Sequence, residues 1–236
     1  MINLPRVQTL QLWLSLKAKR VHQDHEPRYQ ENSEIKRARA YRRPLVQALL
    51  PGDIDKRVKW AEDYLEAAER DFTYPDYILW TDEAIFHLDG HVKRHNAVIC
   101  VTGQVYLQLL QQRVWPALQA IKGEEEEFVV FQHDGASAHY ETCVRAWLDG
   151  KLEDRWMDRG GPILWPTRSP DLSPLDFWLW GFLKNKVYAN VVTTLDKLRQ
   201  AITDEMQAIP ATMVHSVTLG VVRKAGLLFY IDGLQL

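Results

Sequence analysis

The sequence is poor in the features that mark secreted, membrane-spanning and redox-active proteins. Cys100 and Cys143 are the two cysteines among its 236 residues, too few for a disulfide framework or a cysteine metal cluster. No apolar run approaches the roughly 18 residues that a membrane span needs. Arg6 lies close to a short apolar stretch, and no small-residue cleavage site follows it. We therefore expect an intracellular, disulfide-free protein with no membrane segment and no signal peptide.

The chain also lacks internal repeats and a glycine-rich phosphate-binding loop. Its 46% hydrophobic and 25% charged residues exclude disorder, collagen and coiled coil as descriptions of the whole chain. Nine tryptophans indicate a well-packed interior. A length of 236 residues predicts one compact domain with appendages.

Positive charge is concentrated at the beginning of the chain. Residues 1–50 contain ten lysines and arginines and four acids, a net +6, so the remaining 186 residues carry −8 of the total −2. A basic arm on an acidic body is the pattern of a polyanion-binding protein with an acidic site of its own. The alternative is a solvated leader without a binding role. We predict a basic arm over residues 1–43 and a folded domain over 44–236.

Predicted strands and helices alternate along the folded part. Unbroken apolar runs predict buried strands at 77–80, 128–131 and 162–165, and Asp89-Gly90 predicts a hairpin turn. Periodicity and capping residues predict a first helix from Asp53 or Asp55, whose apolar face is Val58, Ala61, Leu65 and Ala68. The next helix is predicted at 105–114, with a kink or a new segment at Pro116. Further helices are predicted at 139–148 and from Ser173-Pro174, and a last one at 195–209. This order is typical of an α/β or α+β domain with a partly parallel sheet.

Three aspartates follow the predicted strands. Asp82 ends the first strand, Asp134 ends the second, and Asp176 lies in the first turn of the helix after the third. Because ligand sites of open α/β sheets lie at the carboxyl ends of the strands, we expect these carboxylates to converge. Mg²⁺ prefers oxygen ligands, and two such ions about 3.5–4 Å apart promote phosphodiester displacement. Each aspartate alone also has a structural interpretation, as a turn, loop or capping residue.

Three stretches resemble motifs of the Tc1/mariner superfamily of DDE/D transposases. They are WTDEAIFHLDGHVKRHN at 80–96, FQHDGASAHY at 131–140 and WPTRSPDLSPLDFWLWGFLKNKVY at 165–188. The third is the most specific, because Trp-Pro, Ser-Pro-Asp-Leu and Pro-Leu-Asp-Phe in this order rarely occur by chance. The resemblance covers residues 40 to 236 approximately and is nearest to the insect mobile-element group that has aspartate as third acid.

The resemblance implies an α/β fold, an RNase H-like core with a mixed sheet flanked by helices. It implies that Asp82, Asp134 and Asp176 are the catalytic, metal-binding acids, that two Mg²⁺ or Mn²⁺ ions are the cofactors, and that DNA cleavage and strand transfer are the reaction. The partner it implies is DNA, at transposon ends. A homodimer and a nuclear location are further expectations, and no small-molecule cofactor is expected.

Two other acids compete for a place in this site. Asp171 is the alternative to Asp176, but the family motif places the catalytic acid five residues later. Glu83 is a weaker candidate, because strand alternation would turn it away from the side that Asp82 faces.

Contact with DNA is expected to be electrostatic and largely independent of base sequence. The candidates are basic residues of the arm and of the motif stretches: Arg37, Arg39, Arg42, Arg43, Lys93, Arg94, Lys184 and Lys186.

The chain departs from the family pattern at two places. Residues 97–101 alone join Asn96 to Thr102, where family members have a longer stretch that supplies two strands. The paired helix-turn-helix domain expected upstream is missing or reduced to residues 1–43. We therefore expect a shortened sheet and impaired catalysis, and a remnant that binds nucleic acid without cleaving it is an alternative. A third hypothesis, a two-carboxylate hydrolase such as a glycosidase, leaves the third motif without a role.

Overall fold

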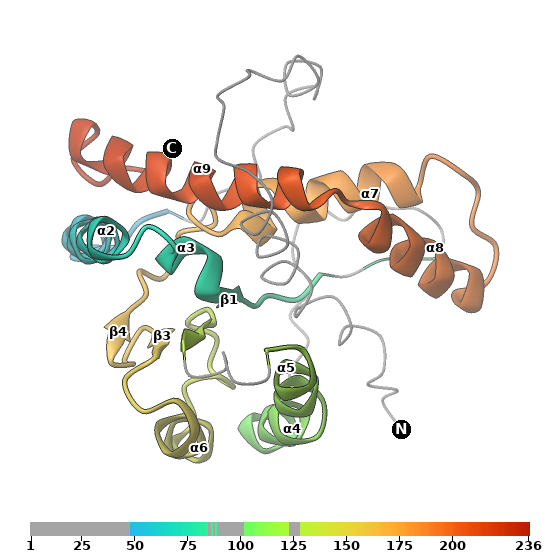
Figure 1. Cartoon of the computed structure of the whole chain (residues 1–236), viewed down its shortest axis with the longest axis horizontal. Helices are drawn as coiled ribbons and strands as arrows, with labels where there is room; N and C mark the ends of the chain where they lie inside the picture. The colour runs from blue at the N-terminus through green and yellow to red at the C-terminus, as the bar shows by residue number, and fades with distance from the viewer. Residues whose placement is uncertain (1–47, 85, 87, 89–101, 123–127) are drawn as a thin grey trace.

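The computed structural model describes residues 48–84, 86, 88, 102–122 and 128–236 (Figure 1). The predicted arm at 1–43, the Asp89-Gly90 hairpin and the segment 97–101 lie outside these residues. So do six of the eight candidate DNA-contacting residues: Arg37, Arg39, Arg42, Arg43, Lys93 and Arg94. The shortened sheet and the reduced DNA-binding region therefore stay predictions.

Four parallel strands form the sheet of the described residues, in the order β1-β2-β3-β4. They are β1 (Ile78–Trp80), β2 (Val130–Gln132), β3 (Trp156–Asp158) and β4 (Ile163–Leu164). Three of them correspond to predicted apolar runs, whereas β3, a three-residue strand that ends in aspartate, was missed. The mixed sheet of the prediction is wholly parallel over these residues, and the hairpin that would add antiparallel pairing falls outside them.

Helices cover both faces of the sheet, so strand residues are buried whichever way they point (Figure 1). Ile78, Trp80 and Val130 pack into the core on one face, while Leu79 and Phe131 pack into the core on the other. This confirms the prediction that the first strand is buried on both faces.

The first face is covered by α2 (Asp53–Arg70), α7 (Trp180–Val187), α8 (Leu195–Ala208) and α9 (Ala211–Tyr230). The prediction that α8 is the last helix is wrong, because the 20-residue α9 follows it and packs across α2 (Figure 1). Its buried residues alternate at spacings of four and three: Val214, Thr218, Val221, Ala225 and Leu228. Neither α9 nor another described helix is long and apolar enough to cross a membrane.

The second face is covered by a helical stretch made of α4 (Gly103–Leu109), η2 (Leu110–Val114) and α5 (Trp115–Lys122), and by α6 (Thr142–Leu152). Every fourth residue of the stretch is buried: Tyr106, Leu110, Val114 and Leu118. The five residues of η2 form a π-helical turn that ends two residues before Pro116. Proline lacks an N–H group and clashes with the carbonyl four residues earlier, so the wider turn relieves that clash and confirms the predicted interruption.

Two helices differ in detail from their predictions. α6 begins at Thr142 rather than at residue 139 and extends to Leu152. The most buried face of α2 is Asp53, Arg57, Trp60, Ala61 and Tyr64, and of the predicted apolar face only Ala61 is fully buried. The shift arises because Asp53 and Arg57 are themselves buried in ion pairs with Arg168 and Asp171, which apolar periodicity cannot reveal. A short helix, α3 (Tyr74–Tyr77), precedes β1 and was not predicted.

Replacing a buried leucine of α9 tests its part in the core. Leu228 is fully buried and Leu227 beside it is 47% exposed. We expect Leu228→Ala to lower the free energy of unfolding by about 2–5 kcal/mol in chemical denaturation, because a cavity remains. Leu227→Ala, the matched control, should change it by less than about 0.5 kcal/mol. Equal effects would contradict the packing of α9 on α2.

Candidate active site

The register of β1 and β2 brings two of the predicted acids to the same edge of the sheet. Trp80 pairs with Gln132, and Thr81 continues the pairing by donating its N–H (3.1 Å) and its hydroxyl (2.7 Å) to the Gln132 carbonyl. Asp82 and Asp134 each follow two residues after this pair. Parallel pairing therefore delivers both aspartates to the carboxyl end of the sheet, as the sequence predicts.

Asp176 approaches from the first turn of η4 (Leu175–Leu179), a π-helical segment that continues into α7. The Ser173 hydroxyl accepts a hydrogen bond from the Asp176 N–H at 3.4 Å, so the predicted N-terminal capping role of Ser173 is present. Burial, followed by the negative charge of Asp134, raises the pKa of Asp176 to about 7. The three aspartates thus act on one another electrostatically, although they come from three separate segments.

Asp82 is held by a tryptophan of α7. The Trp180 indole N–H donates to Asp82 Oδ2 at 2.7 Å. Burial and the charge of Asp176 raise the pKa of Asp82 well above its usual range, although the Trp180 hydrogen bond opposes the shift. Asp82 and Asp176 are therefore two carboxyls that resist simultaneous ionisation.

Asp134 has a different environment, which His139 controls. His139 Nδ1 lies 2.7 Å from Asp134 Oδ1, and its Nε2 lies 3.8 Å from Glu83 Oε1. Burial by itself would lower the pKa of His139, but Asp134 and Glu83 raise it to about 10. Burial likewise acts to raise the pKa of Asp134, but the hydrogen bond and charge of His139 outweigh it and the pKa is lowered. Asp134 is thus an ionised carboxylate beside a cationic imidazolium.

The expectation that Glu83 faces away from the site is wrong. Strand alternation applies only within a strand, and β1 ends at Trp80. Beyond that point, Glu83 turns toward His139, and its charge contributes to the raised pKa of Asp82.

Residues that the sequence analysis missed surround the His139 ring. Tyr106 of α4 lies against it with ring centroids 4.1 Å apart, and His133 stacks on it at 5.0 Å and 10°. His133 is buried, and burial lowers its pKa to about 3, so it is neutral. Its Nε2 lies 3.9 Å from Asp158 Oδ2 at the end of β3. In the sequence, the signals for two of these residues were that His133 precedes Asp134 and that Asp158 ends a strand.

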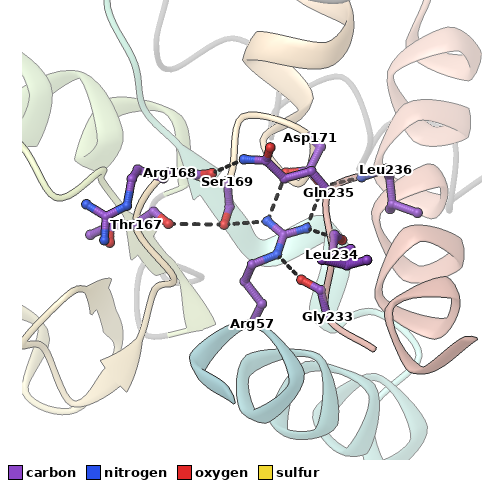
Figure 2. Close-up of polar contacts among 9 residues, drawn as sticks. All are labelled: Arg57, Thr167, Arg168, Ser169, Asp171, Gly233, Leu234, Gln235 and Leu236. Carbon is purple, nitrogen blue, oxygen red and sulfur yellow. Dashed lines mark hydrogen bonds and ion pairs between the residues drawn. The ribbon is translucent and has the colours of Figure 1, made fainter. Parts of the chain in front are cut away.

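Asp171, the alternative third acid, forms an ion pair with a buried arginine (Figure 2). Arg57 of α2 donates to both Asp171 carboxylate oxygens, at 2.9 and 2.6 Å, and both side chains are buried. The same guanidinium donates to the Ser169 hydroxyl (2.6 Å) and to the carbonyls of Gly233 (2.7 Å) and Leu234 (2.9 Å). Asp171 is therefore a structural anchor.

A second ion pair fixes the same loop to the start of α2. Arg168 donates to both Asp53 oxygens at 2.6 Å, and it adopts the left-handed backbone region with φ of 60°. The Gln235 amide donates to the Arg168 carbonyl at 2.8 Å. The loop that precedes Asp176 is thus held from two sides.

The two described candidates for DNA contact lie on α7. Lys184 is close enough to Asp82 and Asp176 to feel their charge, although burial outweighs this and lowers its pKa. Lys186 is exposed, with its ammonium 5.8 Å from the Phe182 ring centre.

The acids match the chemistry of a hard divalent cation, but they are not arranged around one. Carboxylate oxygens are the ligands that Mg²⁺ and Mn²⁺ prefer, and the raised pKa values of Asp82 and Asp176 reflect negative charge that a cation would neutralise. Among the described residues, no three histidine, cysteine, aspartate or glutamate side chains form a group that could hold a metal ion. The carboxylates therefore fit a divalent cation in chemical type, whereas their arrangement does not surround one.

Comparison with known sequences identifies a transposase as a relative. No protein-family model matches the chain. The transposable element Tc3 transposase of Caenorhabditis elegans is 36% identical over 89 residues, which are 37% of this chain and 25% of that protein. The chain thus matches about a quarter of the length of this relative.

Solved structures of Mos1 transposase share the fold. The Mos1 catalytic domain with Raltegravir and Mg has a TM-score of 0.62 at 17% identity, covering 80% of this chain and 100% of that one. The mariner Mos1 paired end complex with Mg has a TM-score of 0.63 at 16% identity, covering 93% and 70%. The RNase H-like α/β fold and the resemblance to Tc1/mariner transposases are confirmed.

Loss of the buried arginine should destabilise the whole chain. Arg57→Ala leaves the buried Asp171 carboxylate without its main partner, and we expect a loss of about 3–5 kcal/mol of unfolding free energy. Arg70→Ala on the same helix removes an exposed arginine paired with Glu66 and should cost about 0–1 kcal/mol. A comparable, small effect of both substitutions in urea titrations would contradict the anchoring role of Arg57.

The raised pKa of Asp176 predicts a pH-dependent stability. An acid whose pKa rises from 3.8 to about 7 on folding stabilises the fold fully below pH 3.8 and loses that contribution as pH rises through about 7. In metal-free buffer, Asp176→Asn should therefore lose about 2–4 kcal/mol less stability than the unsubstituted chain between pH 4 and pH 8.5. The exposed Asp196, changed to asparagine, is the control and should follow the unsubstituted curve. Parallel curves for all three proteins would contradict the shift.

Proposed function

We propose that this chain is a transposase-derived protein whose three aspartates hold two divalent cations, Mg²⁺ or Mn²⁺, for DNA cleavage and strand transfer. The fold and the Tc3 similarity support a transposase-related function. The proposal of metal-dependent cleavage rests on one observation. At the carboxyl edge of a parallel sheet, Asp82, Asp134 and Asp176 come from three separate segments and lie close enough to change one another's pKa.

The three acids and the residues around them would have different parts in such a site. Asp82, Asp134 and Asp176 would supply the oxygen ligands, and the bound cations would activate the attacking oxygen and stabilise the leaving one. Trp180 orients Asp82 through its indole N–H, and His139 orients Asp134 and keeps it ionised. Lys184 contributes positive charge near Asp82 and Asp176.

The proposed partner is DNA. The Mos1 structures include paired-end and strand transfer complexes, and transposon ends are the corresponding proposal for this chain. A nuclear location belongs to the same proposal, since an enzyme of this kind acts on chromosomal DNA. A homodimer is a further part of it.

A second candidate function is nucleic-acid binding without cleavage. Its support is that His139 and Trp180 already occupy carboxylate oxygens of Asp134 and Asp82 at 2.7 Å, oxygens that a cation would have to share. The two candidates differ in a single measurable property, metal-dependent cutting of DNA.

Incubation with supercoiled plasmid tests the proposed chemistry. We expect slow nicking with Mn²⁺, none with EDTA, and a fall to background in Asp134→Ala, because that substitution removes one of the three carboxylates. Asp196→Ala, an exposed acid on α8, is the control and should nick like the unsubstituted chain.

Two outcomes separate the candidates. Nicking that Asp134→Ala leaves unchanged would overturn the assignment of the acids. Retention of DNA in a gel-shift assay together with no nicking would favour the binding protein.

A further inference from the structure

Two arginines lie over one tyrosine ring at the border of the candidate active site. The guanidinium carbon of Arg145, on α6, is 4.4 Å from the centre of the Tyr140 ring. That of Arg159, which follows β3, is 4.0 Å from the same centre. We call Arg145 and Arg159, which share the Tyr140 ring, the Tyr140 arginine pair. Each contact is a cation–π interaction, but together they hold two positive charges near each other.

The pair differs from four other arginines of the described residues, which are used in ion pairs. Arg57, Arg168, Arg70 and Arg199 each form an ion pair with a carboxylate. Over the described part of the chain, neither Arg145 nor Arg159 forms an ion pair of this kind, and Arg145 Nε is buried without a hydrogen-bond acceptor. The charge of Arg159 nevertheless acts on Asp158, where it opposes the effect of burial on the pKa of that acid. Glu141, one helical turn before Arg145, instead accepts a hydrogen bond from the Gly103 N–H at 2.7 Å.

Close packing fixes the pair in place beside Asp134. A Cβ atom added to Gly160 would lie 2.6 Å from Tyr140 Cε2, so backbone and ring are in contact. A Cβ atom added to Gly135, the residue after Asp134, would lie 3.3 Å from Arg159 Cδ. Arg159 therefore reaches from the end of β3 to the loop that carries the catalytic candidate.

We infer that the Tyr140 arginine pair binds the phosphate backbone of DNA next to the active-site acids. A guanidinium is a planar fork that matches phosphate oxygens, and two that form no ion pair within the described residues keep N–H donors for an anion. Two guanidinium groups already cover the ring, so the pair offers charge to a backbone rather than a stacking surface to a base. The inference rests on the proposed function, because adjacency to Asp134 is what selects DNA as the source of the phosphates.

DNA affinity measured without divalent cations tests the pair separately from cleavage. Fluorescence anisotropy with a labelled duplex of mixed sequence, in EDTA, gives the affinity at several salt concentrations. We expect Arg145→Gln/Arg159→Gln to weaken binding and to lower the slope of log affinity against log salt by about 2, since two phosphate contacts are lost. Arg145→Lys/Arg159→Lys keeps both charges and should retain the slope.

Arg199→Gln/Arg223→Gln is the matched control, because it removes the same charge from exposed positions on α8 and α9. Thermal unfolding by circular dichroism must show that the glutamine and lysine variants are folded at the assay temperature. An equal slope in the glutamine variant and the control would overturn the arginine site. Loss of binding in the glutamine variant, together with absent nicking by the unsubstituted chain, would keep the site and refute only the proposed cleavage. Absence of DNA binding by the unsubstituted chain would refute both.

Discussion

The buried guanidinium of Arg57 joins three segments that are far apart in the sequence. It lies on α2, and its hydrogen bonds reach the Ser169–Asp171 loop and the backbone of residues 233–234. A buried charge costs several kcal/mol in lost hydration, and this is offset only when every polar group finds a partner. Arg57 meets that condition through Nε and both terminal nitrogens. Because η4 begins at Leu175, the placement of Asp176 depends on this loop.

Two aspartates of one motif therefore have opposite electrostatic roles. Asp171 is paired with Arg57, so its negative charge stabilises the fold. Asp176, five residues later, is buried and near the charge of Asp134, which the Ser173 hydrogen bond and the charge of Lys184 offset only in part, so its pKa rises. The motif thus combines an anchor with an acid whose charge is left for a partner. This separation gives a physical reason to favour Asp176 over Asp171 as the third acid.

The sequence predicts what depends on local pattern, and misses what depends on distant partners. Apolar runs locate β1, β2 and β4, and the aspartates after them meet as parallel pairing requires. The buried face of α2 is predicted wrongly because Arg57 looks like a surface residue until Asp171, 114 residues away, is seen beside it. Glu83 is misplaced because alternation cannot tell where a strand ends. The Tyr140 arginine pair joins positions whose spacing carries no signal.

His139 makes the candidate site asymmetric. It packs against the rings of both Tyr106 and His133, and its positive charge serves Asp134 and Glu83. Asp134 is consequently ionised at neutral pH, whereas Asp82 lies with Asp176 in surroundings that favour a retained proton. Positive charge brought to this edge would release that proton, because it lowers the free energy of the ionised pair. His139 thus fixes the charge of Asp134, while Arg57 anchors the loop that leads to Asp176, and both constraints meet at the ends of β1 and β2.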